Sequence, residues 1–261
     1  MPDIALLADA LADAESSARP IAQLSDSTSL SLSDAYDVQL FGVLRRVRAG
    51  DPVVGLKLGF TSIEKARQMG VHDVILGVLT ASRDLGAGSS VSLGSMIHPR
   101  IEPELAFKLG PDVAALDLTD PRVDLLDHVT HVAAAVELID SRYRDFRFTV
   151  EDVVADNTSA ARFQVGEWVP FDTVRERVGD LSVTLRASGE EVRSGSTHAI
   201  LGDPLEAVRA VQRLAVRYGH RLPASAVILA GAATAALPMA AATVYEATVE
   251  GVGAVMVQAE V

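Results

Sequence analysis

Apolar positions follow a helical period in the first part of the chain and short strand-like runs in most of the rest. Apolar residues at helical spacing over residues 4–18 predict a first helix. A second helix is expected to begin after Ser33, a suitable N-cap, and to end before Gly50. The apolar run over residues 53–60 predicts a strand, and residues 62–70 a short helix capped by its serine.

After residue 90 the pattern changes to short strands separated by turns. The dipeptides Ser188-Gly189 and Glu250-Gly251 are typical turn signals between two strand-like runs. The strands are expected at residues 91–93, 100–109, 131–139, 162–168, 181–187, 191–194, 226–231, 243–250 and 252–260.

Helices interrupt this strand-rich part at two places. Asp203 and Glu206 match a capping box, with Pro204 at the first helical position and Gly219 beyond the end. A further helix is expected over residues 121–130. Strands and helices do not alternate regularly, so a Rossmann fold or a TIM barrel is disfavoured.

These patterns predict an α+β fold made of two parts. A helical N-terminal region over residues 1–75 is expected to pack on a β-rich domain over residues 76–261. Nearly half of the residues are hydrophobic, so a chain of this length can build a full core.

Composition narrows the functional classes. The chain has no cysteine, which removes disulfides, thiolate metal sites and thiol nucleophiles together. Its formal net charge is −12 and no block of Lys and Arg stands out, so nucleic acid is not an expected partner. The sequence predicts no membrane span and no secretory signal, and a cytoplasmic location is expected.

Three acidic residues are candidates for a metal site. Glu102 and Glu104 are two residues apart, so on a strand they share one face. Glu137 lies between apolar residues and is expected to be buried, which is costly unless the carboxylate is paired or bound to a metal. Such carboxylates suit Mg²⁺ or Mn²⁺. A solvated strand face, or a buried glutamate paired with arginine, is the structural alternative.

Seven short motifs follow one another along nearly the whole chain. They are GLKLGFTS (55–62), QMGV…GVL (68–79), HPRIEPELAF (98–107), VELIDSRYRDF (136–146), DVVADNTSAARF (152–163), AILGDPLEAV (199–208) and EGVGAVMVQ (250–258). The ordered set resembles the 2-oxo-acid hydratase and decarboxylase branch of the fumarylacetoacetate hydrolase superfamily. The resemblance implies a mixed β-roll preceded by helices, with residues 76–261 as the catalytic domain.

The resemblance also assigns residues to a site. It implies that Glu102, Glu104 and Glu137 hold Mg²⁺ or Mn²⁺, and that Lys57 is the active-site lysine. The ion would act as a Lewis acid on the 2-keto group of a small 2-oxo acid substrate.

A polar turn is a further candidate for the lining of the pocket. Asp156, Asn157 and Ser159 follow an apolar stretch, and loops present polar groups in this way. A plain turn without any ligand contact is the structural alternative.

Four features favour a decarboxylase of 2-oxo-3-hexenedioate over a hydratase. Ile75 stands where the hydratase pattern has an acid, while Asp73 is displaced from that position by two residues. His98 precedes a proline, as in sequences that resemble the decarboxylases, and Asp140 occupies a position that is usually small in hydratases.

Arg162 is the fourth feature, because a guanidinium suits the second carboxylate that only the decarboxylase substrate has. Arg142 is the reserve candidate for that carboxylate. The implied reaction yields 2-hydroxypenta-2,4-dienoate, in the meta-cleavage route of aromatic degradation.

Other functions stay open at this point. A 2-hydroxypenta-2,4-dienoate hydratase is the main alternative, followed by a hydrolase of carbon–carbon bonds and by an inactive partner subunit. The three glutamates together with Lys57 argue against an inactive subunit. The resemblance further implies a homo-oligomer that can associate with a paired hydratase.

Overall fold

The computed structural model describes residues 2–62, 73–86, 88 and 90–261. The short helix expected over residues 62–70 falls almost entirely outside them. None of the described helices is long and apolar enough to cross a membrane.

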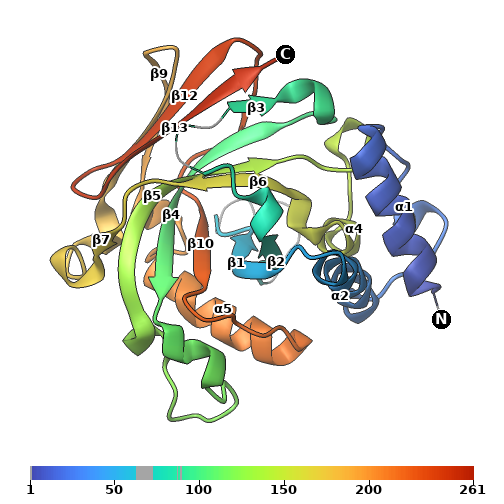
Figure 1. Ribbon diagram of the computed structural model, residues 1–261, viewed down its shortest axis with the longest axis horizontal. Helices are drawn as coiled ribbons and strands as arrows, with labels where there is room; N and C mark the ends of the chain where they lie inside the picture. Colours follow the sequence, from blue (N-terminus) through green and yellow to red (C-terminus); the bar gives the residue numbers. More distant parts are fainter. Residues whose placement is uncertain (1, 63–72, 87, 89) are drawn as a thin grey trace.

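Two β-sheets form the body of the fold, and the helices α1, α2 and α4 gather on one side of it (Figure 1). The first sheet has the order β2-β1-β10-β4-β5-β6, with β11 paired to β4 and β7 paired to β5. The second sheet has the order β3-β13-β12-β8-β9. The strands are β1 Val53–Gly59, β2 Ile75–Thr80, β3 Ser90–Ser92, β4 Arg100–Leu109, β5 Val129–Ile139, β6 Ala160–Val165, β7 Val169–Pro170, β8 Ser182–Ala187, β9 Glu190–Ser196, β10 Val227–Ala232, β11 Leu237–Pro238, β12 Thr243–Val249 and β13 Gly253–Glu260.

The first sheet is mixed, because β1 and β10 run parallel while the other neighbours on its path are antiparallel. Strands β12 and β13 of the second sheet pack on β5 of the first, so much of the core lies between the sheets. This arrangement confirms the expected α+β class with a helical start and mixed sheets.

The helices cover the first sheet from two directions. They are α1 Ile4–Ser17, α2 Leu32–Arg48, α4 Val150–Ala155 and α5 Leu205–Tyr218. Helix α2 packs on α1 and α4, whereas α5 packs on β10, β1 and β2.

Local hydrogen bonds shift some of the expected helix boundaries. Helix α2 is capped by Ser31 rather than Ser33, because Ser31 and Asp34 form a reciprocal capping box. The capping box expected at α5 does not form: its cap is Pro204, and the Glu206 side chain pairs with Arg209 instead.

The helix expected over residues 121–130 is wrong. Only a single 3₁₀ turn, Leu125–His128, forms there. The Gln212 side chain of α5 accepts from the Leu125 N–H and donates to the Val123 carbonyl, so tertiary hydrogen bonds replace the helical ones.

Strand β1 pairs with both β2 and β10 inside the first sheet. A strand from the expected N-terminal region is thus built into the same sheet as the strands of the β-rich part. The division of the chain at residue 75 stays a prediction.

Candidate metal and substrate site

Strands β4 and β5 bring the three candidate carboxylates together. Glu137 of β5 is paired directly with Glu102 of β4, and Glu104 follows two residues further on the same face. One carboxylate oxygen of each residue lies within 4.8 Å of those of the other two. The cluster expected from the spacing therefore forms, and the pairing of β4 with β5 supplies its third member.

Two of these carboxylates are buried with oxygens that accept no hydrogen bond. Glu104 and Glu137 are almost fully buried, and the Oε1 atom of each has no hydrogen-bond partner among the described residues. The other Glu104 oxygen accepts from the Gly231 N–H at 2.9 Å. Burial, with repulsion from Glu102, raises the pKa of Glu137 to about 7, and burial with repulsion from Glu137 raises the pKa of Glu104.

Lys57 of β1 supplies one positive charge to the cluster. Its Nζ lies 2.8 Å from Glu137 Oε2 and donates to the Thr158 carbonyl at 3.2 Å. Burial alone would lower the pKa of Lys57, but the three glutamates raise it, so the ammonium form is favoured. Gly77 faces Lys57 across the β1–β2 pair, and a Cβ there would lie 2.7 Å from the lysine Cδ.

A turn of unusual backbone conformation presents the Thr158 carbonyl to Lys57. Asn157, Thr158 and Ser159 all have positive φ angles, of 49°, 55° and 56°. Residues other than glycine adopt this region at a cost of about 1–2 kcal/mol each, so surrounding contacts must hold the turn. The Asn157 side chain does so, because it donates to the Val78 carbonyl and accepts from the Val78 N–H.

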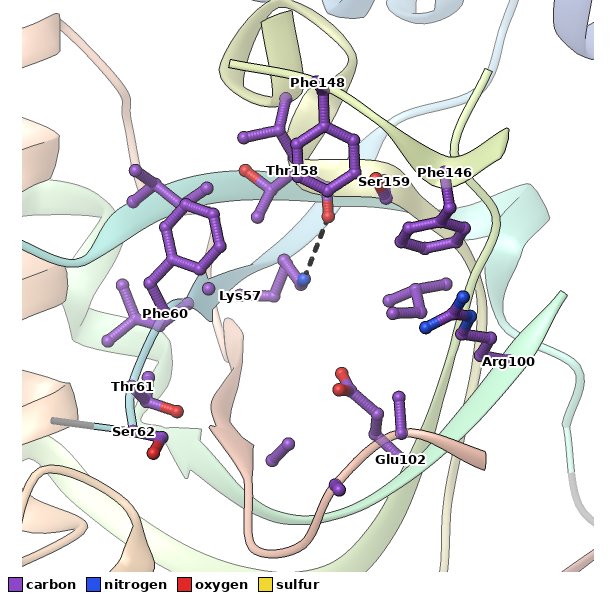
Figure 2. Close-up of a pocket in the computed structure, with 18 of the residues that line it drawn as sticks. Lys57, Phe60, Thr61, Ser62, Arg100, Glu102, Phe146, Phe148, Thr158 and Ser159 are labelled. Atoms are coloured by element: carbon purple, nitrogen blue, oxygen red, sulfur yellow. Dashed lines mark hydrogen bonds between the residues drawn. The ribbon is translucent and has the colours of Figure 1, made fainter. Parts of the chain in front are cut away.

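Lys57 and Glu102 line a cavity of about 690 Å³. Figure 2 shows Lys57, Glu102 and Arg100 around the same opening, with Phe146 and Phe148 on one side of it. The described residues that line it include one carboxylate, Glu102, and the cations Lys57, Arg100 and Arg147, and the rest are mainly apolar and hydroxyl side chains.

Arg100 is a cation of this cavity that sequence reasoning did not single out. Its guanidinium carbon lies 4.2 Å from the centre of the Phe146 ring, and it forms no ion pair within the described part of the chain. Arg100 is two residues before Glu102 on β4, and so shares its face at a spacing of roughly 6.7 Å along the strand. The spacing of two residues between Arg100 and Glu102 was the signal in the sequence that could have identified Arg100.

Ser159 lines the same cavity, whereas its neighbours Asp156 and Asn157 do not. Asp156 forms a buried ion pair with Arg142 and also accepts from the Arg142 N–H. Arg142 donates further to the carbonyls of Asp140 and Ala160. These hydrogen bonds connect the end of β5 to the turn after α4. The contacts of Arg142 and Asp156 in this structure are therefore structural.

Arg162 and His98 also lie outside the cavity lining. Arg162 of β6 is paired with Leu138, so its side chain leaves the sheet on the face opposite to Glu137 and lines a second cavity. The His98 ring lies beside the Phe146 ring, with ring centres 5.1 Å apart. The backbone N–H of His98 donates to Asp140. The substrate-binding role expected of Arg162 and His98 stays a prediction, and the geometry favours Arg100 instead.

The residues present fit a divalent cation. Three carboxylates and one ammonium leave two negative charges, which one divalent ion would balance. The oxygen donors and the buried oxygens without hydrogen bonds also match the preference of Mg²⁺ or Mn²⁺ for carboxylates.

The chain is similar to known proteins over most of its length. The family model for the C-terminal part of fumarylacetoacetate (FAA) hydrolase matches residues 57–259. The chain is 39% identical to a 4-oxalocrotonate decarboxylase of Pseudomonas sp. over 236 residues, which is 90% of each chain. It is 36% identical to a 2-keto-4-pentenoate hydratase of Burkholderia vietnamiensis over 256 residues, 97% of this chain and 95% of the hydratase.

A solved structure is similar over nearly the whole chain. It is that of 4-oxalocrotonate decarboxylase from Pseudomonas putida G7, complexed with magnesium and adipate. The identity is 33%, the TM-score is 0.88, and the match covers 98% of this chain and 97% of that one.

Proposed function

Because the chain belongs to the fumarylacetoacetate hydrolase family, we propose that it is a divalent-metal-dependent carboxy-lyase. Its substrate would be 2-oxo-3-hexenedioate, which loses CO₂ to give 2-hydroxypenta-2,4-dienoate in the meta-cleavage route of aromatic degradation. The observation that carries the proposal is one cavity lined by Lys57, Arg100 and Glu102, with the carboxylates of Glu104 and Glu137 clustered beside Glu102. The similarity to 4-oxalocrotonate decarboxylases supports it.

Glu102, Glu104 and Glu137 would hold the ion, which supplies Lewis-acid polarisation of the 2-keto oxygen when bound. Lys57 lies beside this cluster as an ammonium and would stabilise negative charge that develops on the keto side of the substrate. The Thr158 carbonyl holds the lysine in place. The wall formed by Phe146 and Phe148 limits water around the carbon chain.

Arg100 would bind the distal carboxylate, the group that leaves as CO₂. Arg100 lies two residues before Glu102 on the same face of β4, and both side chains line the same cavity. A guanidinium that forms no ion pair with a described residue is available to a carboxylate.

The position of Ile75 favours decarboxylation over hydration. Ile75 lines the cavity, whereas Asp73 forms an ion pair with Arg213 at 2.6 Å on the surface. Addition of water needs an acid or base beside the reacting carbon, and an apolar residue stands where the hydratase pattern has one. A hydratase remains the second candidate, because a 2-keto-4-pentenoate hydratase is 36% identical over 97% of the chain.

A direct assay separates the two functions. The purified protein with Mg²⁺ is given 2-oxo-3-hexenedioate or 2-hydroxypenta-2,4-dienoate, and CO₂ release and hydration are measured. CO₂ release from the diacid that stops with a strong chelator supports the proposal. Hydration of the monoacid without CO₂ release from the diacid would move the assignment to hydratase.

The substitution Arg100→Leu tests the site of the distal carboxylate. Loss of a charge-assisted hydrogen bond costs about 1.5–3 kcal/mol, so kcat/KM for the diacid should fall roughly ten- to a hundredfold. Inhibition by the five-carbon monoacid product, which has no distal carboxylate, should change much less. Arg186→Leu, at an exposed position of β8, is the matched control.

Two outcomes would contradict the role of Arg100. Equal weakening of diacid and monoacid would remove it from diacid recognition. A loss of diacid turnover in Arg162→Leu, with Arg100→Leu unaffected, would return the role to Arg162.

We also infer a homo-oligomer that can associate with a paired hydratase, and a cytoplasmic location, from the family resemblance. Light scattering on the purified protein tests whether it is a homo-oligomer. Co-purification with the hydratase tests the association of the two enzymes. A monomer at micromolar concentration would contradict the first inference.

A further inference from the structure

A second cavity, of about 580 Å³, lies between the helices α1 and α2 and the strand β6. It is separate from the proposed active site, because none of its lining residues lines the first cavity. Its charged lining includes Glu15 of α1, Arg46 of α2, Arg83 after β2 and Arg162 of β6. An arginine-rich cavity is notable in a chain with a formal net charge of −12.

The carboxylates of this cavity are already engaged. Glu15 is shared between Arg46, at 2.7 Å, and Arg83, at 3.1 Å. Asp156 is paired with Arg142, and Asp140 accepts from two backbone N–H groups before β4. Arg46 also pairs with Asp51 at 3.3 Å, whereas Glu15 is the one carboxylate that pairs with Arg83 among the described residues.

Arg83 and Arg162 meet at a single oxygen atom. The Nη1 atoms of the two side chains donate to the Ala161 carbonyl, at 3.1 Å and 2.8 Å. Arg83 is 97% buried, and its Nε has no hydrogen-bond partner within the described residues. Arg83 pairs with Glu15, but Arg162 forms no ion pair with a described residue. Two guanidinium groups this close repel each other unless an anion lies beside them.

The pKa values of the neighbouring groups point in the same direction. Glu15 is buried, which opposes ionisation, yet Arg83, Arg142 and Arg46 lower its pKa to about 2. Burial, together with repulsion from Arg46, Arg142 and Arg162, lowers the pKa of Arg83 to about 10 despite Glu15. The shift of Glu15 reflects the positive charge of the arginines around it, whereas that of Arg83 is caused first by burial.

We propose that the second cavity binds a small organic carboxylate, whose anionic group bridges Arg83 and Arg162. The guanidinium donors supply the recognition of the carboxylate. Leu11, Val38 and Val43 also line the cavity, so a short apolar body has a surface to contact. This combination favours an organic acid over inorganic phosphate.

The test measures ligand binding by calorimetry on the full-length protein in the presence of a strong chelator, which removes metal-dependent binding in the first cavity. The probes are acetate, butyrate and inorganic phosphate, with chloride at matched ionic strength. Butyrate should bind more tightly than acetate, and Arg162→Gln should weaken both about ten- to a hundredfold. Arg162→Lys should retain part of the affinity, and Arg100→Gln should retain all of it.

A crystal structure grown with butyrate gives a readout that does not depend on any variant folding. Density for the carboxylate between Arg83 and Arg162 supports the proposal. Density in the first cavity only, or binding lost in Arg100→Gln, would overturn it. So would a response that chloride reproduces, binding of phosphate alone, or a change of oligomeric state in Arg162→Gln without any carboxylate binding.

Discussion

Lys57 shows how one side chain depends on several distant parts of the chain. It lies on β1, pairs with Glu137 of β5, donates to Thr158 after α4 and fits against Gly77 of β2. A buried ammonium is stable here because carboxylates surround it.

The substitution Lys57→Met should lower turnover on the order of 10²–10³-fold, because it removes one electrostatic contact to the developing charge. Steady-state kinetics of CO₂ release measure the effect. Lys108→Met, at the partly exposed lysine beside Trp168, is the control and should leave turnover within about threefold. Turnover of Lys57→Met within about threefold of the parent would instead make Lys57 a structural residue.

At the scale of elements, a bulge in β10 orients one of the glutamates. The register of β10 against β4 shifts between Leu229 and Ala232. Within this bulge Gly231 has a φ of 110° and donates its N–H to Glu104. A Cβ at this position would lie 2.3 Å from the Thr61 Oγ1, so both the conformation and the space require glycine.

Gly231→Ala should therefore weaken metal binding and destabilise the protein by about 1–3 kcal/mol. Metal titration and thermal unfolding measure the two effects. The control is Gly189→Ala, because Gly189 also has a positive φ, of 90°, but no atom lies within 4 Å of an added Cβ. Metal affinity lost equally in both variants would contradict this account.

One carboxylate of helix α1 contacts arginines from two other parts of the fold. Glu15 pairs with Arg46 of α2 and with Arg83 after β2, and the arginines lower its pKa to about 2. The folded state therefore holds this proton less tightly than the unfolded state, where the pKa is about 4.5. The stabilisation is present above the unfolded pKa and is lost as the pH falls from 4.5 towards 2.

Glu15→Gln should destabilise the protein by up to about 3 kcal/mol at pH 7. The difference in unfolding free energy from the parent should shrink below about pH 4.5. Chemical denaturation at several pH values measures it, with Glu190→Gln on the exposed β8–β9 hairpin as control. A difference that stays constant down to pH 3 would rule out this ion-pair explanation.

For the whole molecule, the carboxylate cluster links metal binding to stability. Repulsion between Glu102, Glu104 and Glu137 acts in the folded state only, because the unfolded chain separates them. A cation that binds the folded state stabilises it by about 2.7 kcal/mol at a concentration of 100 Kd.

Mg²⁺ at that concentration should raise the Tm by roughly 5–10 °C for a chain of this size, and a chelator should reverse the shift. Glu104→Gln should abolish the shift, because the ion loses one of its three carboxylate ligands. Glu250→Gln, at an exposed turn, should behave as the parent. An equal Mg²⁺-induced shift in Glu104→Gln would exclude Glu104 as a ligand.

The sequence by itself predicted the elements whose signals are local. Turn dipeptides and apolar alternation placed β4, β12 and β13 close to their observed limits, and the E-x-E spacing placed Glu102 and Glu104 on one face. The same local reasoning missed β2 and α4, although Thr149 and Asp152 offered a capping signal for α4.

Only the tertiary structure decided which side chains share a cavity. The register of β4 against β5 sets Glu137 opposite Glu102. Because side chains alternate between the two faces of a sheet, Arg100 lines the first cavity, which Glu102 also lines, and Arg162 lines the second cavity. A period of two fixes which residues of one strand share a face, but long-range pairing fixes which strands face each other. The motifs could therefore identify the family and its carboxylates, whereas the placement of the arginines required the folded chain.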